Sequence, residues 1–435
     1  MASTPRSERQ GEGRGIVALG VVLAAWVLLG ALANLTNLWD SFNLFGLLDV
    51  HVYRMGGRAL LDGAPVYDTR YVVSGLPFTY TPFAAKLFVP LELLGWTGGA
   101  VAVTLASLAA LGRVAVVLSR ALTDQRGGPL GPAWLVPLLL VAVGLSIWPT
   151  RSTLEFVQIN LIVLWLVVED VLGLGRTRWS RWSGVLTGLA VGVKLTPAFL
   201  VPWFVAAGER ARAVRVVATA LATVAVGFVV QPAQAWAYWT RWIFDPTRVG
   251  DPKYVSNQSL NGLLTRMLGE RPPTVLLLGV ALTAGVAAIV VGAQAARRGR
   301  PLDGLAVVLL GTVLVSPISW SHHWVSLIVV VAALAAAPAD EVPGLLRART
   351  VVAAALVALG LPRVIFLVPH GDRAELTLGM GEQVLANAYV LAGLAALAFF
   401  AVVTDSAPVT GAVSDPGRAP APTSAPVPMR TWSRD

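Results

Sequence analysis

The chain has 435 residues, of which 56% are hydrophobic and only 13% are charged. Soluble domains carry about a quarter charged residues, so this composition excludes an ordinary soluble protein and predicts a polytopic membrane protein. The formal net charge is +9, but the arginines gather in short loops between apolar runs. The positive-inside rule explains that pattern better than nucleic-acid binding does. The chain has no cysteine, which excludes disulfides and thiol catalysis.

The N-terminal part is predicted to leave the cytoplasm by one crossing. Residues 1–15 contain three arginines and are expected to be cytoplasmic. The apolar run 16–35 is long enough to cross the bilayer and leads into an external segment of about 36–97. Within that segment, the apolar run 82–94 is too short for a hydrocarbon core of about 30 Å. We interpret it as an interfacial or re-entrant helix.

Three ordinary spans are followed by a segment whose flanking charges conflict with a single crossing. The ordinary spans are predicted at 98–118, 133–149 and 157–174. The next segment, 183–207, has arginines beyond both of its ends, and both ends should therefore be cytoplasmic. Lys194 and Pro197 lie in its middle, and proline disfavours helix at its own position and at the residue before it. We expect two short helices that meet at Lys194–Pro197, with both outer ends inside.

The remaining spans alternate across the membrane. Crossings are expected at 214–231, 273–294, 304–318, 324–337, 349–368 and 383–403, and external segments at 232–272, 319–323 and 370–381. Residues 404–435 are rich in Pro, Ser, Thr and Ala and are expected to be a disordered cytoplasmic tail. The predicted fold is all-α. One transmembrane domain, 16–403, has about 10 full transmembrane helices plus the broken pair, with both termini cytoplasmic.

Asp49 is a candidate for chemistry because it lies where the chain leaves the bilayer. A carboxylate there is a general base, an ion ligand or half of a structural pair, and Arg54 is available as its partner. His51 is expected either to orient Asp49 or to be a surface residue. The proline–aromatic block 76–83 forms either a wall for a lipid or sugar, or a rigid corner. The candidate substrate-binding residues of this region are His51, Tyr53, Arg54 and Tyr80.

Other candidates lie on the predicted external face or in the broken helix. Lys194 is costly in a membrane unless it faces protein or a water-filled cavity, so its partner is a lipid phosphate or a helix C-terminus. His322 and His323, at a hairpin tip, suit phosphate or sugar contact, proton relay or metal binding. No further metal ligands lie nearby in sequence, so no metal is expected. The polar and aromatic candidates near the second external loop are Arg241, Tyr254, Asn257, Gln258, Asn261 and Trp320.

Six sequence blocks, in this order, resemble one family. They are Leu48-Asp49-Val50-His51-Val52-Tyr53, Leu76-Pro77-Phe78-Thr79-Tyr80-Thr81-Pro82-Phe83-Ala84, Gln158-Ile159-Asn160, Gly192-Val193-Lys194-Leu195-Thr196-Pro197, Asn257-Gln258-Ser259-Leu260 and Ser316-Pro317-Ile318-Ser319-Trp320-Ser321-His322-His323-Trp324. The ordered set resembles glycosyltransferase family 87, the actinobacterial α-1,2-mannosyltransferases of the GT-C superfamily. The resemblance covers about residues 16–400.

The resemblance implies a multi-pass plasma-membrane enzyme with its active site outside. Its donor would be polyprenyl-phosphate-mannose, and its acceptor a mannolipid such as a phosphatidylinositol mannoside, lipomannan or lipoarabinomannan. Asp49 matches the acidic residue of the first external loop that serves as catalytic base, here in an inverting transfer. No cofactor and no nucleic-acid partner are implied. The candidates for contact with the donor phosphate are His322, His323, Lys194 and Arg241.

Two alternatives to this function are considered. The first is a flippase or transporter of a lipid-linked sugar. The chain has no Walker loop and few intramembrane charges, which disfavours transport driven by ATP or protons. The second is a GT-C enzyme that transfers another sugar, such as arabinose or glucose.

Overall fold

The computed structural model describes residues 48–68, 75–174, 177, 179–245, 248–338, 341–360 and 363–406. The predicted N-terminal segment, the first span and nearly all of the predicted tail lie outside these residues. The described part folds into helices joined by loops and contains no β-strand. An isolated antiparallel bridge joins Asn257 to Trp320. The all-α prediction is thus confirmed for the described part of the chain.

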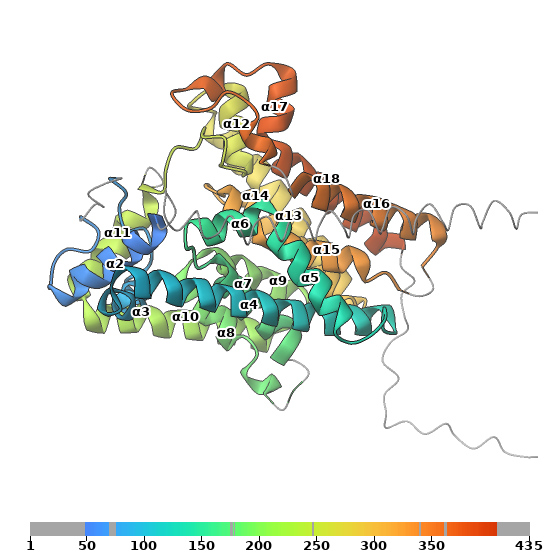
Figure 1. Cartoon of the computed structure of the whole chain (residues 1–435), viewed down its shortest axis with the longest axis horizontal. Coiled ribbons are helices and arrows are strands. Elements are labelled where there is room, and N and C mark those ends of the chain that lie inside the picture. Colours follow the sequence, from blue (N-terminus) through green and yellow to red (C-terminus); the bar gives the residue numbers. More distant parts are fainter. Residues whose placement is uncertain are drawn as a thin grey trace, which may run out of the picture.

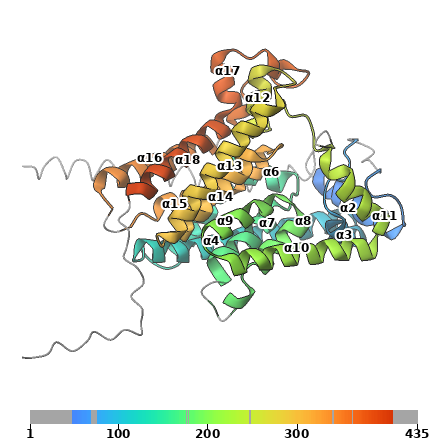
Figure 2. The same cartoon turned by 180° about the vertical axis from the view of Figure 1, so that it is seen from behind.

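The helices form an elongated bundle with a projection on one side (Figure 1). The α-helices are α2 (Leu48–Leu61), α3 (Pro82–Leu93), α4 (Gly95–Arg126), α5 (Leu135–Ser146), α6 (Trp148–Glu155), α7 (Asn160–Val168), α8 (Val185–Val193), α9 (Leu200–Ala206), α10 (Arg210–Val230), α11 (Pro232–Thr240), α12 (Leu260–Leu268), α13 (Thr274–Arg297), α14 (Pro301–Val315), α15 (Leu327–Ala335), α16 (Pro343–Gly360), α17 (Met380–Ala386) and α18 (Ala388–Ser406). Figures 1 and 2 show α2, α3 and α11 together at one end, and α12 with α17 in the projection.

Within the described residues, five helices are long and apolar enough to cross a membrane, or six spans if the bent pair α5–α6 counts as one. The five are α4, α10, α13, α16 and α18. The apolar segments 196–206, 301–315 and 321–335 are shorter. The predicted count of about ten crossings is therefore not confirmed. One predicted crossing, 16–35, lies outside the described residues, and breaks divide several of the other apolar runs; α5 and α6, for example, meet at 68°.

The break predicted in the middle of 183–207 is confirmed. Helix α8 ends at Val193, and Lys194 is extended, with φ −141° and ψ 125°. The chain resumes with a 3₁₀ turn, η4 (Thr196–Phe199), before α9. Proline lacks a backbone N–H and disfavours helix before it, so Pro197 starts the new turn and cannot continue α8. The cytoplasmic location of both outer ends stays a prediction.

The segment predicted to be a short interfacial helix is α3, which has 12 residues. At a rise of about 1.5 Å per residue it is too short to cross a hydrocarbon core of about 30 Å. The side chain of Thr81 accepts a hydrogen bond from the backbone N–H of Ala84, and Pro82 occupies the first turn. Both are typical helix-start features.

Close packing of α2 on α3 fixes the position of Asp49. A Cβ atom on Gly57 would lie only 2.8 Å from the backbone oxygen of Phe88. No residue larger than glycine therefore fits at this crossing. The aromatic ring of Tyr53 stacks on that of Phe88, with centroids 4.4 Å apart. Since Asp49 lies in the first turn of α2, these contacts hold its carboxylate in place relative to the bundle.

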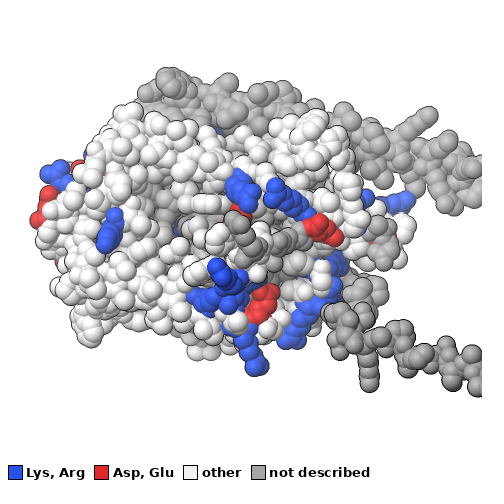
Figure 3. Space-filling view, turned by 90° about the horizontal axis from the view of Figure 1, so that it is seen from below, with Lys and Arg blue, Asp and Glu red and all other residues white. Residues whose placement is uncertain are grey.

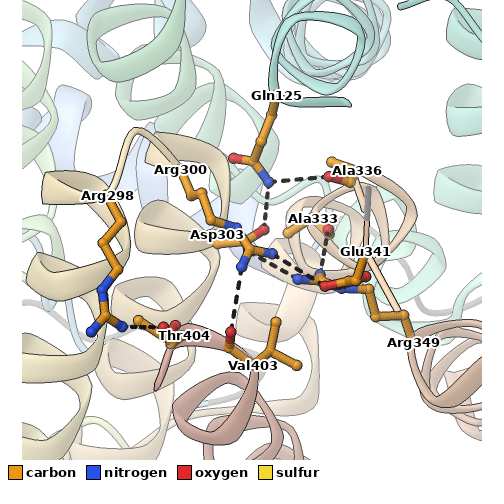
Figure 4. Close-up of polar contacts among 10 residues, drawn as sticks. All are labelled: Gln125, Arg298, Arg300, Asp303, Ala333, Ala336, Glu341, Arg349, Val403 and Thr404. Carbon is orange, nitrogen blue, oxygen red and sulfur yellow. Dashed lines mark hydrogen bonds and ion pairs between the residues drawn. The ribbon is translucent and has the colours of Figure 1, made fainter. Parts of the chain in front are cut away.

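A buried cluster of charges joins α14 to α16 (Figure 4). Asp303 Oδ2 lies 2.7 Å from Arg300 Nη2 and 3.4 Å from Arg349 Nη2. Arg349 Nε is also 2.8 Å from Glu341 Oε2. Asp303 and Arg349 are fully buried. Gln125, from α4, donates to Asp303 Oδ1 at 2.8 Å. Two acidic and two basic groups thus compensate each other in the protein interior.

Arg349→Met is expected to lower the free energy of unfolding by about 3–5 kcal/mol, because it leaves two buried carboxylates, Asp303 and Glu341, with a single cation, Arg300. Unfolding of the purified protein in mixed detergent micelles measures this. Arg58→Met is the matched control, since Arg58 pairs with Asp62 at an exposed site and should change stability little. If the two variants unfold alike, the cluster does not stabilise the fold.

Basic side chains gather on the face seen from below in Figure 3, with few acidic ones, on a surface that is otherwise mostly uncharged. Exposed arginines at the ends of helical segments include Arg181, Arg210 and Arg297. An excess of basic groups on one side is what the positive-inside rule expects of the cytoplasmic face.

Candidate active site

Asp49 lies in the first turn of α2 and is partly buried. Its backbone N–H donates a 3.2 Å hydrogen bond to the carbonyl of Phe156, which ties the start of α2 to the loop before α7. Its side chain is hydrogen-bonded to Gln158 and interacts electrostatically with Lys194. Burial outweighs both contacts and raises the pKa of Asp49 to about 7. A carboxyl group with this pKa can accept a proton near neutral pH.

Two tyrosines fix the orientation of Gln158. The hydroxyls of Tyr53 and Tyr80 donate to its Oε1 at 2.8 and 3.2 Å, and they lie 3.1 Å from each other. Because Oε1 accepts these bonds, the amide nitrogen of Gln158 is the atom that can donate to Asp49. Both tyrosines are buried. In the structure they orient Gln158, which in turn is bonded to Asp49, and the predicted substrate contact stays a prediction.

Lys194 is connected to the histidine turn by a chain of hydrogen bonds. Its Nζ donates to Oδ1 of Asn160 at 2.8 Å. Nδ2 of Asn160 donates at 3.0 Å to the backbone carbonyl of His322, which also accepts a 3.1 Å bond from the hydroxyl of Thr153. Lys194 also interacts electrostatically with Asp49. The broken helix, the start of α7 and the histidine turn thus meet beside the candidate base.

The two histidines lie in the 3₁₀ turn η7 (Ser321–Ser326), between α14 and α15. Their rings are 4.8 Å apart and nearly perpendicular. His322 is buried, and neither of its ring nitrogens has a hydrogen-bond partner among the described residues. Buried polar atoms are normally satisfied, so these nitrogens indicate a place for a ligand.

A cavity of about 70 Å³ lies beside Lys194 and His323. Its polar wall also includes Asn160 and Ser319. The rest is mostly apolar and comes from α7, α9, α14 and η7; it includes Val163, Leu164, Val167, Leu200, Leu309, Val313 and Val325. A cation at the head of an apolar cavity suits an amphiphilic ligand with an anionic group.

Backbone strain marks the segment that supplies the two amide side chains. Val157 has φ +55°, which is rare for a β-branched residue. Such strain persists only where the surroundings fix it, and it is common at functional sites. Gln158 and Asn160 follow directly. Sequence analysis included these two residues only in a block of family resemblance and assigned them no role. The one sequence signal for a role was the presence of two amide side chains at the start of a long apolar run.

Arg54 and His51 contact the neighbouring helices α3 and α4. Arg54 Nε lies 3.0 Å from Glu92 Oε2, so the acidic partner of Arg54 in the structure is Glu92. The ring of His51 lies 3.5 Å from that of Trp96. Both side chains therefore join α2 to neighbouring helices, because α3 and the start of α4 provide an acid and an aromatic ring on that side.

Arg241 does not join the groups around Lys194. It is exposed, and its guanidinium lies over the ring of Trp242, 4.1 Å from the centroid. The candidate phosphate-binding set of the sequence is therefore brought together only in part. Lys194, His322 and His323 lie together, and Arg241 is held elsewhere by its cation–π contact.

The amide side chains predicted as substrate ligands in the second loop make hydrogen bonds within the fold. Asn257 is buried; it accepts from the backbone N–H of Ser319 and donates to the carbonyl of Pro252. Gln258, also buried, donates to the carbonyls of Val255 and Ala386 and accepts from the N–H of Tyr389. Asn261 donates to the carbonyl of Pro317. These bonds hold the loop against neighbouring segments, and substrate contact by the three residues stays a prediction.

Tyr254 and Trp320 are more accessible. Tyr254 is 37% exposed, and its ring centroid lies 6.2 Å from that of Trp320, which is half-buried. Among the described residues, no group of three or more His, Asp or Glu side chains is arranged to hold a metal ion. That the protein works without metal or cofactor stays a prediction.

The fold and the site define a class of protein. A multi-helix membrane protein holds a candidate base beside a cation at an apolar cavity, which suits an enzyme acting on a lipid-linked anionic substrate. Residues 78–317 match the model of glycosyltransferase family 87. The chain belongs to this family and is a hexosyltransferase.

Curated relatives cover most of the chain. A polyprenol-phosphate-mannose-dependent α-(1-2)-phosphatidylinositol mannoside mannosyltransferase of Mycolicibacterium smegmatis is 33% identical over 398 residues, 84% of this chain and 87% of the relative. The protein of the same name in Mycobacterium tuberculosis is 32% identical over 77% of this chain and 80% of the relative. A polyprenol-phosphate-mannose-dependent α-(1-2)-phosphatidylinositol pentamannoside mannosyltransferase of M. smegmatis is 36% identical over 69% of this chain and 72% of the relative. No solved structure matches the chain.

Proposed function

We propose that this protein transfers mannose from polyprenyl-phosphate-mannose to a mannosylated phosphatidylinositol, forming an α-1,2 linkage. The observation that carries the proposal is the position of Asp49 beside Lys194, where Lys194 heads an apolar cavity. The names of the relatives supply the donor and the acceptor class. Lipomannan and lipoarabinomannan are larger acceptors of the same chemistry.

The proposed reaction is a single displacement. Asp49 takes the proton from the 2-hydroxyl of the acceptor mannose as that oxygen bonds to the anomeric carbon of the donor. The bond between this carbon and the phosphate oxygen breaks, and polyprenyl phosphate leaves. Lys194 compensates the charge of the leaving phosphate, and His322 and His323 donate hydrogen bonds to it. The configuration inverts, so a β-linked donor gives an α-linked product.

We further propose that the reaction takes place on the outer face of the plasma membrane. The basic face of Figure 3 supports a cytoplasmic side that carries the arginine-rich loops. Both termini are proposed to be cytoplasmic, and the turn with His322 external. Family membership favours a transferase over the transporter alternative.

Reconstitution into vesicles with radiolabelled polyprenyl-phosphate-mannose tests the proposed function. The expected product is a phosphatidylinositol mannoside extended by one or more α-1,2-linked mannoses and sensitive to an α-1,2-mannosidase. Arabinose or glucose donors, supplied in parallel, test the alternative of another sugar. Label that crosses the membrane without entering a product would support a transporter and overturn the proposal.

Transfer is expected to decline about tenfold per pH unit as the pH falls below about 7, because Asp49 must be deprotonated to accept a proton. Burial raises the pKa of this carboxyl to about 7; charged Lys194 and the bond from Gln158 oppose the rise without cancelling it. The pH profile of kcat/KM for the acceptor measures the effect.

The nearby His51 provides the comparison for this profile. Burial and the charge of Arg54 lower the pKa of His51 to about 4. A half-point near pH 4 would therefore point to His51, and a flat profile would remove Asp49 as the titrating base. The His51→Gln variant should show the same pH profile as the wild-type enzyme.

A further inference from the structure

Aromatic and cationic side chains from three separate segments form one exposed face beside the histidine turn. We call it the outer aromatic face; it consists of Tyr254, Trp320, Arg363, Phe366 and His370. The ring centroids of Tyr254 and Trp320 are 6.2 Å apart, those of Tyr254 and His370 6.4 Å, and those of Phe366 and His370 5.4 Å. The rings therefore form a continuous row.

Arg363 is the cation of this face. Its guanidinium lies 4.4 Å from the ring centroid of Trp148 and 5.0 Å from that of Phe366. It is exposed, and it makes no ion pair with any carboxylate among the described residues. Nearby arginines differ: Arg373 pairs with Glu270, and Arg151 with Glu155. Arg363 is thus held by aromatic rings while its charge stays available to an anion.

The face adjoins the candidate active site through Trp320, which precedes the histidine turn. Its indole is fixed by the second loop, since a Cβ atom on Gly250 would lie 2.5 Å from it, and Gly250 has φ +136°. A second link runs through helix α6, which holds both Trp148, the ring under Arg363, and Thr153. The hydroxyl of Thr153 donates a hydrogen bond to the backbone carbonyl of His322. The face and the histidine turn therefore adjoin each other.

We propose that the outer aromatic face binds the headgroup of the acceptor glycolipid. Aromatic rings offer apolar surface to the C–H faces of sugar or inositol rings, and a guanidinium matches the geometry of a phosphodiester. This inference rests on the proposed function. The donor phosphate is assigned to the cavity at Lys194 and His323, which leaves Arg363 for the acceptor's own anion.

Arg363→Gln is expected to raise the KM for a phosphatidylinositol mannoside about tenfold, since one charge-assisted interaction is lost. The kcat and the KM for the donor should not change. A neutral acceptor, octyl α-mannoside, has no phosphate, so its KM should be the same in both enzymes. Tyr254→Ala should raise the KM for both acceptors, because it removes stacking surface.

Arg373→Gln is the matched control, because Arg373 is exposed in the loop that follows Arg363 and already has an acidic partner. If the KM for the phosphatidylinositol mannoside is the same in Arg363→Gln as in Arg373→Gln, the inference is overturned, while the proposed function stands. An equal rise for the neutral acceptor or for the donor overturns it as well.

A binding measurement separates this inference from the proposed function. If the wild-type enzyme transfers no mannose, the proposed function fails, and turnover cannot be used. Asp49→Asn protein is then titrated with glycerophosphoinositol dimannoside, with and without Arg363→Gln. About tenfold weaker binding in the double variant supports the face. Equal binding, or none in either protein, overturns it.

Discussion

Asp49→Asn is expected to lower mannose transfer by a factor of about 10²–10⁴, the usual contribution of a general base. Asparagine has the same shape as aspartate, and its side-chain oxygen can still accept the bond from Gln158. Donor binding and thermal stability should therefore be kept while turnover is lost. Single-turnover assays with labelled donor in vesicles measure the loss.

Asp62→Asn is the matched control for this variant. Asp62 follows the end of α2 and pairs with Arg58 at an exposed site, so its removal should leave transfer at the wild-type rate. Near-native turnover in Asp49→Asn would exclude Asp49 as the base. A loss of donor binding together with turnover would instead make Asp49 a donor ligand.

Lys194→Met is expected to reduce turnover by a factor of about 10² or more, because the leaving phosphate loses its cation. The variant should also move the acid limb of the pH profile to higher pH. The charge of Lys194 favours the ionised form of Asp49, and its removal raises the pKa of that carboxyl further. Turnover across pH at saturating donor measures both effects.

Lys86→Met serves as the control, since Lys86 is exposed on α3. A Lys194→Met enzyme with reduced turnover but an unshifted acid limb would keep the phosphate role and remove the coupling to Asp49. Unchanged turnover would contradict the phosphate role itself.

Charge at unusual positions made part of the site predictable. Asp49, Lys194 and the histidine pair were found because ionisable groups are rare in such an apolar chain. The break at Lys194–Pro197 followed from loop charge and proline chemistry, and the structure has it. These features depend on local sequence, so no knowledge of distant contacts was needed.

Other parts of the site depend on contacts between distant segments. Gln158 matters because Tyr53, 105 residues away, donates to it, and no local pattern reveals that bond. Arg54 pairs with Glu92 across two helices, although Asp49 is closer in sequence. The amides of the second loop looked like ligands, but neighbouring backbone groups use their hydrogen-bonding capacity. Composition alone does not separate these cases.

The buried charges of α14 and α16 also impose an order on biosynthesis. Asp303 and Arg349 are 46 residues apart, so the ribosome, at about 5–20 residues per second, supplies the second several seconds after the first. Until then α14 holds a carboxylate that lacks one of its two arginines. The α14–α15 hairpin that carries the histidine turn therefore reaches its final packing only after α16 has been inserted. Nascent chains that stop before α16 should remain targets of membrane quality control.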